Sequence, residues 1–156
     1  MRRAPVLALA SLLAVPLLGG CGRKKAELAG VGDWRFGITT LKDAGRCETN
    51  EQPVWCFEMP LSVAGHTVEP NLYFESAEPE AKLVEILLSF SGCREAEVGK
   101  WLDDGRGAPS EERAGRRYYA RKKVFVSAQL PAEPSRCEIS FVLPDDAERI
   151  AKLKAK

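Results

Sequence analysis

The stretch Lys82-Leu83-Val84-Glu85-Ile86-Leu87-Leu88-Ser89-Phe90 is apolar on both faces at its centre. A helix and a buried strand both fit such a run, because a short apolar segment has no decisive periodicity. The β-branched and aromatic residues within it, and the Ser91-Gly92 pair that follows it, favour the strand. We therefore expect a buried β-strand over residues 82–90.

Other segments on both sides of this run are also typical of strands. Residues 54–59 are rich in β-preferring side chains, and residues 71–75 follow a turn predicted at Gly65-His66. Residues 117–130 and 137–143 alternate between apolar side chains and their neighbours, which indicates strands with two different faces. The segment 105–115 is polar and contains proline and glycine, so we expect a loop there.

Three segments are predicted to be helical. The first begins with Thr39 or Thr40 as its cap and ends near residue 46. The second is capped by Ser91, carries an apolar stripe at i, i+3 and i+4 spacing, and stops at Gly105. The third runs from a capping Asp145 to about residue 154.

This order of elements predicts an α+β fold, in which an antiparallel sheet carries its helices on one face. The chain also suggests two divergent helix-plus-strands repeats. The phrase Phe36-Gly37-Ile38-Thr39 stands before the first helix, and Phe90-Ser91-Gly92-Cys93 stands before the second.

The N-terminus has the layout of an export signal. Met1-Arg2-Arg3 supplies two positive charges, and residues 4–18 are almost wholly apolar. This run has about 15 residues, whereas a bilayer-spanning helix needs roughly 20. It leads into Leu18-Gly19-Gly20-Cys21, which resembles the bacterial lipobox: an aliphatic residue, two small residues and a cysteine. We therefore expect a lipoprotein signal peptide over residues 1–20.

The lipobox resemblance implies where the mature protein resides. In that family the cysteine thiol carries a diacylglycerol and the chain is cut before it, so Cys21 becomes a lipid anchor in the bacterial envelope. Gly22 stands where an aspartate would resemble an inner-membrane retention signal, which favours the outer membrane, facing the periplasm. Residues 21–32 are expected to be a flexible tether, and residues 33–156 a single domain.

Four cysteines remain after Cys21: Cys47, Cys56, Cys93 and Cys137. An even number of cysteines in an exported chain predicts disulfides, here two. Three pairings are open from the sequence. We favour Cys47–Cys56 with Cys93–Cys137, because neighbours in sequence meet easily. None of the spacings resembles a zinc-binding CxxC pair, so we expect no metal.

The net charge of the chain and the sequence motifs that it lacks argue against several classes of function. Loss of residues 1–20 removes Arg2 and Arg3 from 23 basic residues and none of the 22 acidic ones, so the formal net charge changes from +1 to −1. Such balance argues against a nucleic-acid partner. His66 is the single histidine, and no GxSxG, phosphate-loop or dinucleotide motif is present. We expect no enzyme and no cofactor.

One surface feature is a candidate binding patch. It consists of basic residues with two tyrosines among them: Arg113, Arg116, Arg117, Tyr118, Tyr119, Arg121, Lys122 and Lys123. Such a patch suits an anionic partner. The alternative is a soluble sheet edge, where lysine and arginine prevent strand-to-strand association. The three tryptophans, Trp34, Trp55 and Trp101, are interpreted as core residues.

The order of elements over residues 33–143 resembles small periplasmic lipoproteins, namely outer-membrane assembly lipoproteins of the SmpA/OmlA kind and the β-lactamase-inhibitor-protein fold. That resemblance lies in the layout alone, and it implies a protein-binding module. Our hypothesis is a non-catalytic envelope lipoprotein that docks on another envelope protein. The alternative hypothesis is a periplasmic lipoprotein that binds a small ligand or a glycan.

Overall fold

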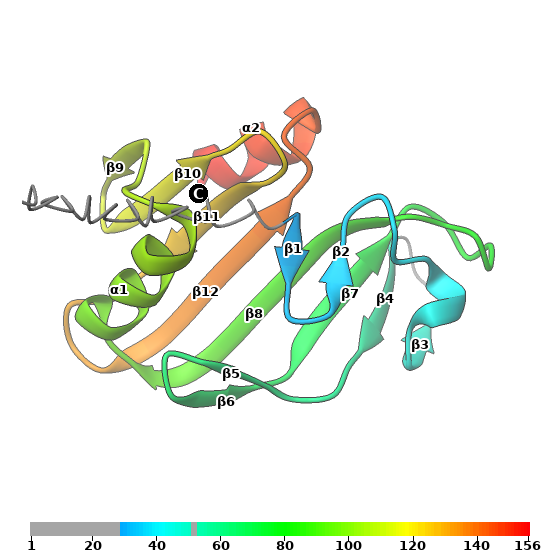
Figure 1. Cartoon of the computed structure of the whole chain (residues 1–156), viewed down its shortest axis with the longest axis horizontal. Helices are drawn as coiled ribbons and strands as arrows, with labels where there is room; N and C mark the ends of the chain where they lie inside the picture. The colour runs from blue at the N-terminus through cyan, green and yellow to red at the C-terminus, as the bar shows by residue number, and fades with distance from the viewer. Residues whose placement is uncertain (1–28, 51–52) are drawn as a thin grey trace, which may run out of the picture.

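The computed structural model describes residues 29–50 and 53–156. The elements, in chain order, are β1 (Gly30–Val31), β2 (Trp34–Arg35), the 3₁₀ helix η1 (Leu41–Asp43), β3 (Arg46–Glu48), β4 (Val54–Phe57), β5 (Leu61–Val63), β6 (His66–Val68), β7 (Pro70–Phe74), β8 (Leu83–Cys93), α1 (Glu95–Arg106), β9 (Glu111–Arg113), β10 (Arg116–Ala120), β11 (Phe125–Gln129), β12 (Ser135–Val142) and α2 (Ala147–Ala155). The fold is α+β and antiparallel, as predicted, and the sheet is its dominant part (Figure 1).

One eight-stranded sheet organises the molecule, in the order β3-β4-β7-β8-β12-β11-β10-β9. The apolar run 82–90 is indeed a strand. It lies in β8, the longest strand, which pairs with β7 on one side and β12 on the other. Pairing with β12 continues as far as Cys93, so Ser91 extends the strand and does not cap a helix.

The sheet consists of two four-stranded meanders joined at β8 and β12. The first meander holds β3, β4, β7 and β8, and the second holds β9 to β12. Each is preceded by a helical element, η1 in the first half and α1 in the second. A helical element therefore stands before each meander, while the origin of the two halves as divergent repeats stays a prediction.

The two α-helices lie on opposite faces of the sheet, so the prediction that helices gather on one face is wrong. Phe141 of β12 belongs to the core that contains Val98 and Leu102 of α1, whereas Val142 packs with Leu153 of α2. Successive strand residues point to opposite faces. Both faces are apolar at this end of the sheet, and each therefore requires its own helix. Figure 1 shows α1 before the sheet and α2 behind it.

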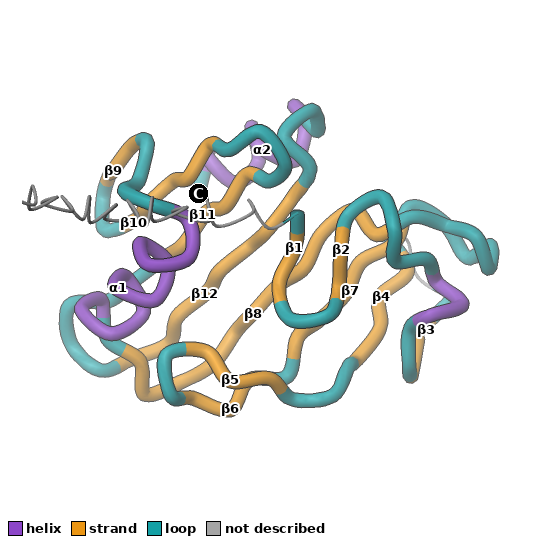
Figure 2. The backbone as a smooth tube through the Cα atoms, viewed as in Figure 1, coloured by secondary structure: helices purple, strands orange, loops and turns teal. Residues whose placement is uncertain are grey.

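We call the side that carries α1 the front face and the side that carries α2 the back face. The front face holds the main core. There, Val31 of β1 and Val63 and Val68 of the β5–β6 hairpin pack with α1 over the sheet. Figure 2 shows both small hairpins lying across this side. The front face is thus covered from both halves of the chain.

The first predicted helix is much shorter than expected. Only Leu41–Asp43 is helical, with Thr40 as its cap. The Asp43 carboxylate accepts hydrogen bonds from the Thr40 amide at 2.9 Å and from its hydroxyl at 2.8 Å, and these bonds lower the pKa of Asp43. The chain must then extend, because Cys47 of β3 lies opposite Cys56 of β4. The predicted helix therefore ends at Asp43, and the chain is extended where it enters β3 at residue 46.

Other boundaries differ by smaller amounts. The cap of α1 is Arg94, and this helix ends at Gly107, whose φ of 76° suits glycine. The cap of α2 is Asp146, one residue after the predicted one, because its Oδ1 accepts the Arg149 amide at 3.0 Å. The predicted strand 117–130 is a hairpin, β10 and β11, and the predicted loop 105–115 contains β9.

The signal peptide and most of the tether, including Cys21, lie outside the described residues. The end of the predicted tether, however, belongs to the folded domain. Gly30 and Val31 form β1 and pair with β2, and Val31 is buried. The ordered domain therefore begins before residue 33. No helix within residues 29–50 and 53–156 is long and apolar enough to cross a membrane.

Both disulfides join the cysteines that we favoured. Cys47 and Cys56 face each other across β3 and β4, with a Cα–Cα distance of 4.0 Å. Cys93 at the end of β8 bonds to Cys137 of β12, with a Cα–Cα distance of 6.0 Å. The first bond ties the outermost strand to its neighbour, and the second ties the two meanders together.

We expect the second disulfide to contribute more stability than the first. Loop-closure entropy grows with loop length, so replacing Cys93 and Cys137 by alanine should lower the free energy of unfolding by about 4 kcal/mol. Replacing Cys47 and Cys56 should lower it by about 2.7 kcal/mol. Urea denaturation of the two double variants measures both values. A larger loss from the short loop would contradict this expectation.

Candidate functional site

The back face of the sheet is covered at one end only. There, Leu153 and Ile150 of α2 pack on Tyr118, Phe125 and Val142. Among the described residues, α1 and η1 pack with the front-face core, which leaves α2 as the one helix on the back face. The back of β4, β7 and β8 carries no helix from residues 29–50 and 53–156.

The uncovered part of the back face has aromatic and apolar side chains at its centre. This centre, which we call the open face, consists of Trp55, Phe57, Asn71, Tyr73 and Leu87, and strand register places the polar residues Arg46, Glu48, Ser89 and Glu138 around it. Strand register aligns Trp55 with Tyr73, Phe57 with Asn71, and Asn71 with Leu87. The rings of Trp55 and Phe57 lie 4.4 Å apart. These side chains therefore form one continuous surface.

Burial separates the open face clearly from the front-face core. Val54, Cys56 and Leu72 alternate with the open-face residues along β4 and β7, and each is 0% exposed. Trp55 and Tyr73 are only half-buried. A sheet face with large aromatic side chains that stay partly in water is a feature of binding surfaces. This is the main reason to place a functional site here.

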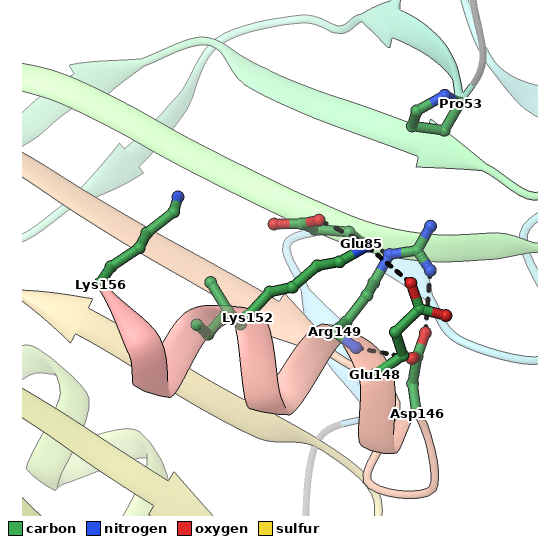
Figure 3. A pocket seen from close by; sticks show the side chains of 8 residues that line it. Pro53, Glu85, Asp146, Glu148, Arg149, Lys152 and Lys156 are labelled. Atoms are coloured by element: carbon green, nitrogen blue, oxygen red, sulfur yellow. Dashed lines mark hydrogen bonds and ion pairs between the residues drawn. The ribbon is translucent and has the colours of Figure 1, made fainter.

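A groove of about 330 Å³ runs between the open face and α2. Glu85 of β8 forms one wall, while Asp146, Arg149, Lys152 and Lys156 project from the α2 side. Figure 3 shows Arg149 between two carboxylates. Its Nε lies 3.8 Å from Glu85 Oε2, and its Nη1 lies 2.8 Å from Asp146 Oδ2. The groove thus places a charged network beside an aromatic surface.

Glu85 is the unusual group in this network. Burial raises the pKa of its carboxyl, although the Ser140 hydroxyl and the charges of Arg149 and Lys156 favour the ionised form. The pKa of neighbouring Tyr73 is also raised, by burial and then by the charges of Glu85 and Glu138. Ionisable groups in unfavourable surroundings cluster at functional sites. Glu85 therefore marks the groove as part of the candidate site.

The sequence interpretation missed this site, although two signals were present. Glu85 is the one acidic residue inside the apolar run 82–90. Trp55 and Phe57 alternate with Val54 and Cys56, which indicates that they belong to a different face. Trp55 was predicted to be a core residue, and that prediction is wrong because its face of the sheet lacks a cover. Trp34 and Trp101 do pack against the core.

The predicted basic patch is split between the two faces of the sheet. Arg116 and Tyr118 lie on the back face. Arg116 is 8% exposed, and its Nη2 donates to Gln129 Oε1 at 2.7 Å. Tyr118 is buried between Phe125 and the Lys154 ammonium, which lies 5.4 Å from its ring centre. Both side chains lie on the back face, under or beside α2.

Arg117 and Tyr119 lie on the front face, against α1. Arg117 makes ion pairs with Glu95 at 2.8 Å, Glu112 at 3.2 Å and Asp103 at 3.8 Å. The buried Tyr119 hydroxyl donates to Asp103 Oδ1 at 2.9 Å. Burial first, and then Asp103, raise the pKa of Tyr119 to about 12. This cluster joins α1 to β10.

The rest of the basic segment does not form a continuous surface with these residues. The Arg121 guanidinium donates to the Arg106 carbonyl at 2.6 Å and to the Ala108 carbonyl, and so holds the loop after α1. Arg113 is exposed in β9, and Lys122 and Lys123 are exposed in the β10–β11 turn. The eight residues therefore do not form a single basic patch.

His66, the single histidine, and Asp104 each contact neighbouring side chains. His66 lies in β6, where its Nε2 is 3.4 Å from Glu97 Oε2 and its ring packs on Phe90. Asp104 pairs with Lys100. Within the described part of the chain, no group of three or more histidine, cysteine, aspartate or glutamate residues is placed to hold a metal ion.

Comparisons of the chain with protein-family models, with curated proteins and with solved structures found no match.

The raised pKa of Glu85 predicts how a neutral replacement changes stability. The folded state binds the Glu85 proton more tightly than the unfolded state does, so this carboxyl reduces stability as the pH rises through and above its ordinary pKa. Glu85→Gln should therefore be more stable than the wild type at pH 7, and the difference should vanish near pH 4. Urea denaturation at both pH values measures this.

Glu148→Gln is the matched control on the same groove. Hydrogen bonding to Lys152 lowers the pKa of Glu148, so its replacement should not raise stability at pH 7. If Glu85→Gln were less stable than the wild type at pH 7, the ionised carboxylate would stabilise the fold, and burial would not dominate its energetics.

Proposed function

We propose that this protein is a non-catalytic, lipid-anchored protein of the bacterial envelope that binds another protein through its open face. The observation that carries the binding proposal is the half-buried aromatic surface around Trp55 and Tyr73, next to the groove with Glu85. The lipobox at Cys21 supports the anchor, and the two disulfides suit an exported protein. We propose the outer membrane, on its periplasmic side.

The composition of the open face favours a protein partner. Aromatic side chains at the centre of a surface, with charged groups at its rim, are typical of protein interfaces. Trp55, Phe57 and Tyr73 form such a centre. The rim contains Arg149 and Glu85, which already hold each other in place. A partner therefore meets a surface whose polar groups are largely preorganised, which limits the entropy lost on binding.

The anchor is tested by Cys21→Ser. Without the thiol no lipid can be attached, so the variant should fractionate as soluble or uncleaved protein and lack the acyl mass. Fractionation of cell membranes followed by mass spectrometry of the intact protein measures both properties. A variant that fractionates and weighs like the unmodified parent would show that Cys21 carries no lipid.

Binding is tested by crosslinking in the producing cells, with mass spectrometry of the proteins that copurify. One dominant envelope protein should be recovered with the wild type. Trp55→Ala combined with Tyr73→Ala should weaken its capture by about 30-fold or more, as expected when central aromatic residues are removed. The fold should persist, because neither side chain belongs to the buried cores.

Arg113→Ala is the matched control for the binding test. This residue is exposed and belongs to the basic segment predicted from the sequence, not to the open face. Capture that is lost with Arg113→Ala and kept with the double variant would move the interface to the basic segment. Recovery of no specific protein would overturn the protein-binding proposal in favour of a glycan or small ligand on the same aromatic residues.

A further inference from the structure

A second surface lies where the chain enters the domain. We call it the tether-side edge and define it by Ala29, Gly37, Ile38, Lys122, Lys123 and Pro144. An open groove of about 570 Å³ with mainly apolar walls lies here, with the two lysines and Asp145 at its rim. Ile38 directly follows Gly37, which lines the groove. It is 75% exposed and is one of the two large hydrophobic residues exposed in the described chain.

The length of chain before this edge limits its distance from the lipid. Ala29 lines the groove itself, and it lies eight residues after Cys21. Even fully extended, eight residues span at most about 29 Å. This stretch also contains Arg23, Lys24 and Lys25, which are attracted to anionic lipids. The edge is thus the part of the domain whose distance from the membrane surface is most restricted.

The chemistry of the edge suits the head-group region of a bilayer. An exposed aliphatic side chain gains by leaving water, and each lysine close to an anionic surface strengthens the association about fivefold. Asp145 opposes this attraction in part. Because the anchor holds the domain at a high effective concentration near the bilayer, a weak contact is sufficient to orient it.

We propose that the tether-side edge lies against the head groups of an anionic membrane, with Ile38 at the interface and Lys122 and Lys123 on lipid phosphates. This inference rests on the lipid anchor of the proposed function. It goes beyond that function because it assigns a face and an orientation to the anchored domain.

The test attaches the domain to lipid without relying on cells to do so. In the mature chain from Cys21, the other four cysteines are in disulfides, so a maleimide lipid couples to Cys21 alone. The coupled protein is placed in nanodiscs of phosphatidylglycerol and phosphatidylethanolamine. Hydrogen exchange of the amides at 37–38 and 122–123 should be slower than in the uncoupled protein, while exchange at the Ala64-Gly65 turn stays unchanged.

Matched variants separate this contact from a general effect of the bilayer. Ile38→Ser with Lys122→Glu and Lys123→Glu should abolish the protection. Met59→Ser with Lys42→Glu and Lys100→Glu should keep it, because Met59 is about as exposed, at 79%, the change in charge is the same, and all three residues lie off the edge. Exchange that is unchanged at the edge, or slowed on another surface, would overturn the proposal. Protection that appears without nanodiscs and grows with protein concentration would indicate self-association, and would also overturn it.

The two proposals fail separately. If cells do not attach lipid to Cys21, the Cys21→Ser fractionation shows it, while the chemically coupled protein still reports whether the edge contacts a bilayer. If lipid is attached but the edge is not protected, the anchor stands and the orientation is wrong.

Discussion

The pairing of β8 with β12 is the interaction on which the rest of the structure depends. It extends from Glu85 opposite Val142 to Cys93 opposite Ser135, and it joins two meanders that would otherwise be separate sheets. The disulfide from Cys93 to Cys137 closes the same junction covalently. Because strand register fixes the face of every side chain, this pairing also decides which residues reach the core and which reach the open face.

The two faces of the sheet are covered by other elements to different extents. The front face is covered by α1 and two small hairpins, and its side chains are almost completely buried. The back face is covered by α2 over the second meander only. Trp55 and Tyr73 remain half-buried over the first meander, and Glu85 stands at the boundary, where α2 ends its coverage and burial raises its pKa. This asymmetry is the physical basis of the proposed binding site.

The proposed membrane contact and the proposed binding surface meet at the β12–α2 turn. Asp145 lines the groove of the tether-side edge, and its neighbour Asp146 lines the groove beside α2. On these proposals, a partner on the open face stands directly beside the membrane that holds the lipid. The anchor would then contribute to binding by restricting where the open face is presented, in addition to keeping the protein in the envelope.

The sequence by itself determined local features, namely the strand over 82–90, a threonine cap near residue 40, the amphipathic second helix and the presence of two disulfides, because composition and spacing encode them directly. The pairing of the cysteines was settled by which strands lie side by side. Tertiary structure decided the rest. Pairing of Cys47 with Cys56 replaced most of the first helix by a strand, and alternation in β10 distributed the basic segment over both faces. The open face depends on which strands α2 covers, and packing between distant segments, not local periodicity, determines that coverage.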